Sequence, residues 1–343
     1  MRDLVIIGAG PAGISAAYEA QKAGLDYVVI EKGLIGNTIY NYPIGLTVFS
    51  TPDELELNRG DLKPCREKPT REELLSYYVR FVLDNGLNVR TEEKVLAVGL
   101  DAVSGKNNSS GESELHHPFV VRTNKATETA RNVLFATGAM EYPRRLNVPG
   151  EDLSFVHHQF RETYPWVRKR ALVIGGGNSA GEAALFLAEE GAETTLAIFR
   201  QDWENTDPKQ GCIKYWVKQP LEEQINRRCL TLFFLGKVLQ FDEGIALLES
   251  EDGESAEIPV DVVFVLIGAE ADLSLLVSLG IRFENSKHGK VPIYNPETFE
   301  TEIPGIYVAG HFTHQRHIKG AIEAGRTVIN SLKSRLAGNL KTV

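Results

Sequence analysis

Two glycine-rich segments constrain the fold of this chain more than any other feature of its sequence. Each follows a short apolar run and precedes an alanine-rich stretch, at residues 8–13 and again at residues 175–180. A turn of this kind between a buried strand and a helix binds the pyrophosphate of a dinucleotide, because small residues let backbone N–H groups and the helix N-terminus reach the anion. The sequence therefore predicts an α/β protein with two dinucleotide-binding domains of Rossmann-like, ββα type.

The first turn leads to a strand that ends in an acid. Gly8 permits the tight turn, Gly10 lets backbone amides approach a pyrophosphate, and Gly13 lets the helix pack close to the strand. Glu31 closes the next predicted strand, 18 residues after Gly13. Its carboxylate can accept hydrogen bonds from an adenosine ribose, which suits the AMP half of FAD.

The second turn leads to a strand that ends in a base. Gly175 and Gly177 repeat the first two glycines, and Ala180 takes the third place, where a small residue suffices. Arg200 stands where the first site has its acid. Because a guanidinium pairs with a phosphate and an acid would repel it, this site is predicted to prefer NADP(H) to NAD(H). No Ser-His-Asp signature is present, so the expected chemistry is hydride transfer carried by the cofactors.

Hydropathy and turn signals predict the remaining elements. A helix is expected at residues 71–85, between the N-cap Thr70 and Gly86. The Ser/Gly/Asn-rich residues 104–114 are expected to form an exposed hairpin tip. Further helices are predicted at residues 14–23 and 181–190, with a last one ending over 327–336, and strands at residues 4–7, 27–30, 88–100, 118–123, 133–135, 172–174, 194–199, 230–235, 237–241, 246–248, 262–267 and 305–309.

Composition excludes several classes of partner. The 343 residues carry a net charge of −9, and no run of about five basic residues is present, so nucleic acid is not expected as a ligand. No apolar stretch of about 18 residues and no signal-peptide pattern occur, so no membrane association is expected. Cys65, Cys212 and Cys229 are too sparse for a disulfide framework, which favours a cytoplasmic protein. Cys229 precedes an apolar run and is predicted to belong to the core.

The motifs together resemble one group of flavoproteins. The match is to the thioredoxin-reductase-like group with two dinucleotide-binding domains, and it is carried in order and spacing by residues 8–31, 136–138, 175–200 and 305–310. The resemblance covers nearly the whole chain. It implies a homodimer or higher homo-oligomer, and a discontinuous FAD domain with an inserted NADPH domain: residues 1–155 and 290–343 for FAD, and residues 156–289 for NADPH.

A closer resemblance is to the bacillithiol disulfide reductase (YpdA-type) family. It is carried by residues 38–43 with 49–50, by residues 157–165 and by residues 291–301. The family implies FAD, NADPH and a low-molecular-weight disulfide as oxidant. It also implies that Tyr40, Asn41 and Tyr42 lie beside the flavin, and that the helix starting near Gly320 points its N-terminus at the flavin. Besides these residues and the two motifs, the candidates for cofactor binding are Pro11, Ala12, Lys32, Thr38, Thr137, Gly138, Asn178, Ser179, Gly310, His311 and Ala321.

The chain departs from these families in its redox cysteines. It has no CxxC, so it cannot run the dithiol relay of thioredoxin reductases. Ala12 replaces the cysteine that bacillithiol disulfide reductases usually carry after the proline of the first turn. His311 stands where the flavin motif often has an acid, and the bacillithiol-type proteins also depart there. The expected partner is a small-molecule disulfide or a small redox protein, reduced without the family cysteine.

Other functions stay open at this point. A ferredoxin- or flavodoxin-NADP⁺ reductase also needs no cysteine, and basic residues at 144–145, 168–170 and 227–228 are candidates for docking an acidic partner. A flavin monooxygenase is less favoured, because no FxGxxxH-type sequence lies near His157. A flavoprotein that senses NADPH or redox state is a non-enzymatic alternative. His311, His314 and His317 follow each other at intervals of three with no cysteine or acid partner, so no metal site is predicted.

Overall fold

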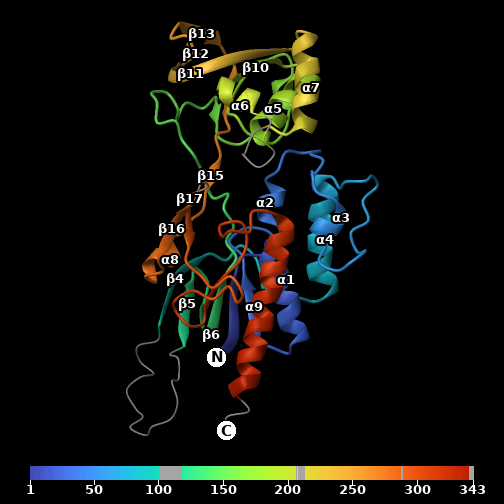
Figure 1. Ribbon diagram of the computed structural model, residues 1–343, viewed down its shortest axis with the longest axis vertical. Helices are drawn as coiled ribbons and strands as arrows, with labels where there is room; N and C mark the ends of the chain where they lie inside the picture. The colour runs from blue at the N-terminus through green and yellow to red at the C-terminus, as the bar shows by residue number, and fades with distance from the viewer. Residues whose placement is uncertain (101–117, 206, 208–212, 287–288, 340–343) are drawn as a thin grey trace. The chain divides into compact units, whose positions relative to one another are not determined.

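The chain folds into two compact units, one of which interrupts the other. The computed structural model describes residues 1–100, 118–205, 207, 213–286 and 289–339. Unit 1 comprises Met1–Glu141 and Ala271–Val343, and unit 2 comprises Tyr142–Glu270 (Figure 1). The predicted α/β class, with a discontinuous first domain, is confirmed.

The chain passes from unit 1 to unit 2 between residues 141 and 142 and returns between residues 270 and 271. The boundaries predicted from the sequence were 155/156 and 289/290. Packing accounts for the difference. Leu146, Val148 and Phe155 pack against the core of unit 2, so the segment before residue 156 belongs there. Leu276 and Ile281 are buried in a core of unit 1, so the segment after residue 270 has already returned to that unit.

Unit 1 is built on a sheet with the strand order β3-β2-β1-β6-β5-β4, in which β18 also pairs with β6. The strands β1, β2, β3, β18 and the end of β6 run parallel, and β4, β5 and the start of β6 form an antiparallel meander. The bounds are β1 (Arg2–Ile7), β2 (Tyr27–Ile30), β3 (Val89–Arg90), β4 (Val95–Leu100), β5 (Phe119–Thr123), β6 (Thr127–Phe135) and β18 (Ile306–Val308). A two-stranded ribbon joins β16 (Phe283–Ser286) to β17 (Gly289–Pro292).

Both faces of this sheet are covered. Leu4 and Ile6 face a core with α1, α4 and α9, whereas Val5 and Ile7 face a second core with β4, β5 and the segment around α8. Figure 1 shows α1 and α9 side by side. The Thr70 side chain caps α4 and Glu73 completes a capping box, as the N-cap prediction implies. The helices are α1 (Pro11–Lys22), α2 (Asn37–Tyr40), α3 (Pro52–Leu55), α4 (Arg71–Asp84), α8 (Ser274–Ser278) and α9 (Ile318–Asn339).

Unit 2 has a sheet of its own, with the order β13-β12-β11-β10-β9-β14-β8. The strands β8, β14, β9, β10 and the start of β11 are parallel, and β11, β12 and β13 form a meander. Helices α5 (Asn178–Glu189) and α7 (Tyr215–Asn226) pack on one face. The bounds of the strands are β8 (Val156–His157), β9 (Arg170–Ile174), β10 (Glu193–Ile198), β11 (Leu230–Asp242), β12 (Ile245–Ser250), β13 (Ser255–Pro259) and β14 (Val262–Val265). The remaining elements are η1 (Tyr164–Trp166), α6 (Arg200–Glu204), and the ribbon of β7 (Tyr142–Pro143) with β15 (Ala269–Glu270).

Several local predictions need correction. The two strands expected at 230–235 and 237–241 are one strand, β11, with an irregular register at Gly236, where a Cβ would overlap the Ser250 carbonyl. The strand expected at 88–100 is divided, because Glu92 adopts a positive φ of 54°. Helix α7 and strand β13 carry no signal that predicts them from the sequence in this way. Residues 104–114 and Cys212 lie outside the described part of the chain.

Cys229 is exposed, so its assignment to the core is wrong. It lies in the turn between α7 and β11, directly after Arg228, whose φ is 61°. Its Sγ contacts the carbonyl of Arg227 at 3.8 Å, and the buried run begins only at Leu230. Among the described residues, no helix is both long and apolar enough to cross a membrane.

Candidate dinucleotide-binding sites

The first glycine-rich turn joins β1 to α1 at the carboxyl end of the parallel sheet in unit 1. Gly8 has a φ of +112°, and a Cβ there would overlap the Ala136 carbonyl. A Cβ on Gly13 would overlap the carbonyl of Gly8, so the helix packs against the turn as closely as the motif requires. Around Gly10, by contrast, a Cβ would meet no described atom within 4 Å. This open backbone fits the approach of a pyrophosphate.

Glu31 organises the same turn. It is buried, and its Oε2 accepts a hydrogen bond from the N–H of Ala9 at 2.7 Å, while its Oε1 accepts from the N–H of Gly33 at 2.8 Å. Each carboxylate oxygen keeps a lone pair, so the group can still accept from a ribose hydroxyl. The neighbouring Lys32 is exposed and forms an ion pair with Glu141.

Segments far apart in the sequence meet around this turn. The N–H of Ala136 donates to Ile7, and the N–H of Ala309 donates to Phe135, so the ends of β1, β6 and β18 are joined side by side. A Cβ on Gly310 would lie 3.5 Å from the Cβ of Ala12, and a Cβ on Gly138 would lie 4.0 Å from Oγ1 of Thr38. The structure thus gathers the predicted residues of the first motif with Thr38, Gly138 and Gly310. Thr137, between them, is exposed.

The first part of the predicted flavin-side segment belongs to the short helix α2. The N–H of Asn41 closes this helix on the carbonyl of Asn37, at 3.1 Å. Arg71 fixes its end, because its Nη2 donates to the Tyr40 carbonyl at 2.6 Å and its guanidinium lies 5.5 Å from the centre of the Tyr40 ring. Tyr42 packs against the core of unit 1. Sequence reasoning missed Arg71, whose buried Nε has no hydrogen-bond partner among the described atoms.

The segment after β18 leads into the long helix α9. His311 is exposed, and its carbonyl accepts from Nη1 of Arg316 at 3.0 Å. The first turn of α9 contains Gly320 and Ala321, and the N–H of Ala321 donates to the carbonyl of His317. Ser15 of α1 donates to the Ile322 carbonyl at 2.8 Å, which fixes this end of α9 beside α1.

The histidines of this segment differ from expectation in one respect. Nε2 of His314 lies 2.7 Å from Oε1 of Glu284, so His314 does have an acid partner, 30 residues away in the sequence. Over the described residues, His, Cys, Asp and Glu side chains form no group of three that could hold a metal ion.

The second glycine-rich turn joins β9 to α5 in unit 2. Gly175 abuts the Leu266 carbonyl and Ala180, whereas a Cβ on Gly177 would meet no described atom within 4 Å. Asn178 begins α5, its Oδ1 accepts from the N–H of Lys214, and Ser179 is exposed. As in α1, the described residues provide no side chain that caps the N-terminus. The N–H groups of both first turns therefore fit an anionic ligand.

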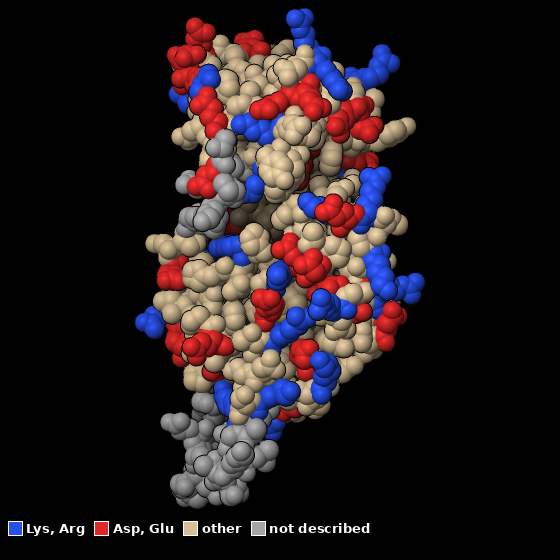
Figure 2. Space-filling model, turned by 45° about the vertical axis from the view of Figure 1, so that its right-hand side comes forward, with Lys and Arg blue, Asp and Glu red and all other residues tan. Residues whose placement is uncertain are grey.

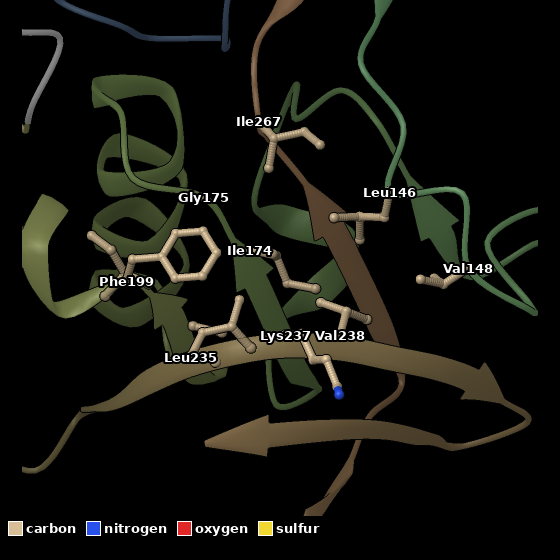
Figure 3. Close-up of a pocket in the computed structure, with 12 residues that line it drawn as sticks. Leu146, Val148, Ile174, Gly175, Phe199, Leu235, Lys237, Val238 and Ile267 are labelled. Atoms are coloured by element: carbon tan, nitrogen blue, oxygen red, sulfur yellow. The ribbon is translucent and has the colours of Figure 1, made fainter. Parts of the chain in front are cut away.

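A cavity of about 220 Å³ opens beside Gly175, at the carboxyl ends of β9 and β10. Figure 3 shows that its wall is mainly apolar, with Phe199, Leu235 and Ile267 among the side chains around it. Lys237 is a charged member of the wall, and its Nζ pairs with Glu249 at 3.1 Å. An apolar recess next to a pyrophosphate turn suits a flat purine base.

Arg200 begins α6, two residues after the end of β10, as expected for a residue at the ribose position. Its guanidinium is engaged by an acid, because its Nε lies 2.8 Å from both carboxylate oxygens of Glu251 and its Nη2 also contacts that carboxylate. The guanidinium also stacks 3.8 Å from the centre of the Phe234 ring. Sequence reasoning missed Glu251, because it reaches the site from a hairpin 51 residues further along the chain.

A second residue missed from the sequence is Asp202. Its carboxylate packs against the backbone of Gly176, in the middle of the glycine-rich turn. Burial raises the pKa of Asp202 above its ordinary value. A signal was present, since Asp202 follows Ala180 at about the spacing at which dinucleotide sites carry a ribose-binding acid.

The two described cysteines lie outside both sites. Cys65 is exposed, its N–H donates to Oε1 of Glu73 at 2.8 Å, and its thiol also hydrogen-bonds that carboxylate. Glu73 raises the pKa of the Cys65 thiol, while these hydrogen bonds lower the pKa of Glu73 to about 2. A thiol held protonated by an acid is a poor nucleophile.

Three of the arginines suggested as part of a docking patch form ion pairs with acids. Arg144 pairs with Glu270 at 3.2 Å, Arg145 with Asp152 at 2.6 Å, and Arg170 with Asp261 at 2.7 Å. On the face drawn in Figure 2, basic and acidic side chains are interspersed.

Comparison with known proteins identifies the relatives of this chain. Residues 5–310 match the family model described as pyridine nucleotide-disulphide oxidoreductase. The chain is 34% identical over 308 residues to bacilliredoxin reductase Bdr of Bacillus subtilis (strain 168), which covers 89% of this chain and 88% of that protein. It is 26% identical over 322 residues to a ferredoxin–NADP reductase of Ignicoccus hospitalis, covering 91% and 90%.

A solved structure agrees with these sequence matches. The bacillithiol disulfide reductase Bdr (YpdA) from Staphylococcus aureus superposes with a TM-score of 0.86 at 32% identity, covering 97% of this chain and 98% of that one. The resemblance expected from the motifs is confirmed.

Proposed function

Because this chain belongs to the pyridine nucleotide-disulphide oxidoreductase family, and is accordingly a flavoprotein oxidoreductase that uses FAD and NAD(P)H, we propose that it reduces a low-molecular-weight thiol disulfide. Bacillithiol disulfide is the substrate of this class that the similarity to Bdr favours. The observation that carries the proposal is the pair of glycine-rich turns, each leading into a helix whose N-terminus no described side chain caps.

Unit 1 is the proposed FAD domain and unit 2 the proposed NAD(P)H domain. In unit 1, Glu31 closes the turn as an acid, which suits an adenosine ribose. In unit 2, the apolar cavity beside Gly175 offers room for the adenine, and Arg200 supplies a cation near it. When bound, the two cofactors supply hydride transfer from nicotinamide to flavin and on to the acceptor.

The residues proposed to lie beside the flavin are held rigidly. Arg71 fixes the end of α2 and thereby the positions of Tyr40 and Asn41. Gly320 and Ala321 present the N-terminal turn of α9, whose N–H groups and dipole favour negative charge on a ring nearby. We thus propose that α2 positions the flavin and that the backbone N–H groups of α9 stabilise its negative charge.

Ala12 sets this chain apart within the proposal. It is buried at the start of α1 and carries no sulfur, so thiol–disulfide exchange at this position is not available. Cys65, held protonated by Glu73, is no substitute. We therefore propose that the disulfide is reduced directly at the flavin.

A second candidate is a ferredoxin- or flavodoxin-NADP⁺ reductase. It is favoured by Ala12, because one-electron transfer from a flavin needs no cysteine, and by the similarity to ferredoxin–NADP reductases. The ion pairs of Arg144, Arg145 and Arg170 lower the positive charge that unit 2 could offer an acidic partner.

An anaerobic stopped-flow experiment tests these proposals. The flavin of the purified protein is bleached with NADPH and then mixed with either bacillithiol disulfide or ferredoxin. Rapid reoxidation by the disulfide is the expected result. Reoxidation by ferredoxin alone would move the protein to the second candidate, and no bleaching by NADPH or NADH would contradict the assignment of the two sites. Size-exclusion chromatography tests the homodimer that the family resemblance implies.

A further inference from the structure

A carboxylate, that of Asp202, lies against the second glycine-rich turn, two residues after Arg200 in the sequence. A Cβ placed on Gly176 would lie 2.8 Å from both Cβ and Cγ of Asp202, so the acid rests directly on the turn. Asp202 belongs to α6, which follows β10 at the position where dinucleotide sites hold the adenosine ribose. Its partial burial raises its pKa, and the charged form gains from hydrogen-bond donors placed against it.

The first site shows what such an acid does. Ala9 is the second residue of the first turn, and its N–H donates to Glu31, the acid proposed for the ribose of FAD. Gly176 is the second residue of the second turn, and Asp202 lies against it. In both turns, a carboxylate thus lies against the second residue. Only Glu31, however, directly follows its strand, as the motif predicts.

The guanidinium of Arg200, in contrast, is engaged by two acids. Its Nε is 2.8 Å from both oxygens of Glu251, and its Nη1 is 3.6 Å from Oε1 of Glu204. A ribose 2′-phosphate would have to displace Glu251 to gain the bidentate edge of the guanidinium. It would also approach Asp202, whose negative charge repels it.

We propose that Asp202 accepts the adenosine ribose hydroxyls in the second site and that Glu251 holds Arg200 back from a 2′-phosphate, so that the site takes NADH as well as NADPH. The proposal deepens the proposed function and rests on the assignment of NAD(P)H to unit 2. It makes Asp202 and Glu251 the residues that set cofactor specificity.

Binding of adenosine nucleotides to the FAD-loaded protein tests the proposal without turnover. Isothermal titration calorimetry gives the affinities for 2′,5′-ADP and 5′-AMP. Because these nucleotides differ only in the 2′-phosphate, the ratio of the two affinities reports the contribution of that phosphate. The wild type is expected to bind the two within about tenfold of each other. Glu251→Gln should tighten 2′,5′-ADP by about tenfold and leave 5′-AMP unchanged, because Arg200 is released. Asp202→Asn should weaken 5′-AMP by about tenfold and spare 2′,5′-ADP.

Glu254→Gln is the matched control, since it removes the same charge from the same β12–β13 turn. Glu251 is exposed, so its replacement leaves the fold intact and keeps the test valid should Asp202→Asn not fold. The rates of flavin bleaching by NADPH and by NADH, measured for each variant, give a second measure of the preference for the 2′-phosphate.

Two results would overturn the proposal. Only the second of them would also contradict the proposed function. A wild type that prefers 2′,5′-ADP by about a hundredfold, with a ratio unchanged in Glu251→Gln, would mean that Arg200 already serves a phosphate. The proposed function would then stand without this inference. A flavin that neither NADPH nor NADH bleaches, with no binding of either nucleotide, would remove the assignment of unit 2 and the proposed function together.

Discussion

The carboxylate of Glu31 accepts a hydrogen bond from the N–H of Ala9 at 2.7 Å, across 22 residues of sequence. This bond ties the end of β2 to the glycine-rich turn after β1, so the residue proposed to hold the ribose of FAD also shapes the cradle for its pyrophosphate. Both tasks fall to one buried side chain.

Replacing Glu31 by Ala is therefore expected to release FAD. The change removes an acceptor from two backbone N–H groups and from the ribose, and one charge-assisted hydrogen bond is worth about 1.5–3 kcal/mol. We expect the dissociation constant for FAD to rise at least about tenfold. The flavin absorbance at about 450 nm, divided by the protein absorbance, measures the fraction of protein that holds FAD. Glu67→Gln, on an exposed side chain of the same unit, is the control, and equal FAD retention in both variants would contradict the role of Glu31.

Gly177, in the second glycine-rich turn, gives a prediction of its own. A Cβ on Gly177 would meet no described atom within 4 Å, and its φ of −106° suits any residue, so Gly177→Ala is expected to fold normally. The added methyl group would stand where a pyrophosphate approaches the backbone. We expect NADPH binding to weaken by about tenfold or more, with FAD content unchanged.

The control for this prediction is Gly99→Ala in β4. A Cβ there also meets no described atom within 4 Å, but the residue lies in the meander of unit 1. Titration calorimetry with NADP⁺ compares the two variants. If Gly177→Ala bound NADP⁺ as tightly as Gly99→Ala, the second turn would not be the pyrophosphate site.

Much of the fold was predictable because its signals are local. The strand at Tyr27–Ile30, the cap at Thr70 and the two glycine-rich turns depend on neighbouring residues, and each is found as expected. Cys229 shows the limit of this reasoning. An apolar run follows it, yet the turn at Arg228 places it outside that run, and hydropathy alone does not locate such a turn.

The electrostatics of the second site could not be predicted in the same way. Arg200 is visible in the sequence as the residue after the strand predicted at 194–199, but its partner Glu251 reaches it from the β12–β13 turn. Asp202 follows Ala180 at a suitable spacing, yet its contact with Gly176 depends on the direction that α6 takes after β10. Residue type predicted a phosphate site, whereas the charges around Arg200 depend on tertiary structure.

The cysteines lead to a further prediction. The double variant Cys65→Ser, Cys229→Ser is expected to keep disulfide reduction within about twofold of the wild type, because neither thiol lies in a proposed site and Glu73 keeps Cys65 protonated. Steady-state oxidation of NADPH with bacillithiol disulfide measures it. Alkylation of Cys65 by iodoacetamide should be slow at pH 7 and faster in Glu73→Gln. A loss of disulfide reduction together with unchanged bleaching by NADPH would instead assign a redox role to these thiols.

The last prediction concerns Glu182 in α5. Burial raises the pKa of this carboxyl from about 4.5 to about 7. The native state therefore keeps a proton that the unfolded chain releases at lower pH, so stability falls as the pH rises from about 4.5 to 7 and is level above that. Since one pKa unit corresponds to about 1.4 kcal/mol, the contribution lost by pH 8 is about 3 kcal/mol.

Glu182→Gln should remove this dependence. It is expected to stabilise the protein by about 2–3 kcal/mol at pH 8 and to change little at pH 5, where the wild-type carboxyl is already neutral in the native state. Urea unfolding at the two pH values measures the difference, and the fluorescence of Trp166 and Trp203 follows unit 2. Glu190→Gln is the control, because Glu190 is the exposed C-cap residue of the same helix. An equal effect of Glu182→Gln at both pH values would show that burial of the charge does not limit the stability of α5.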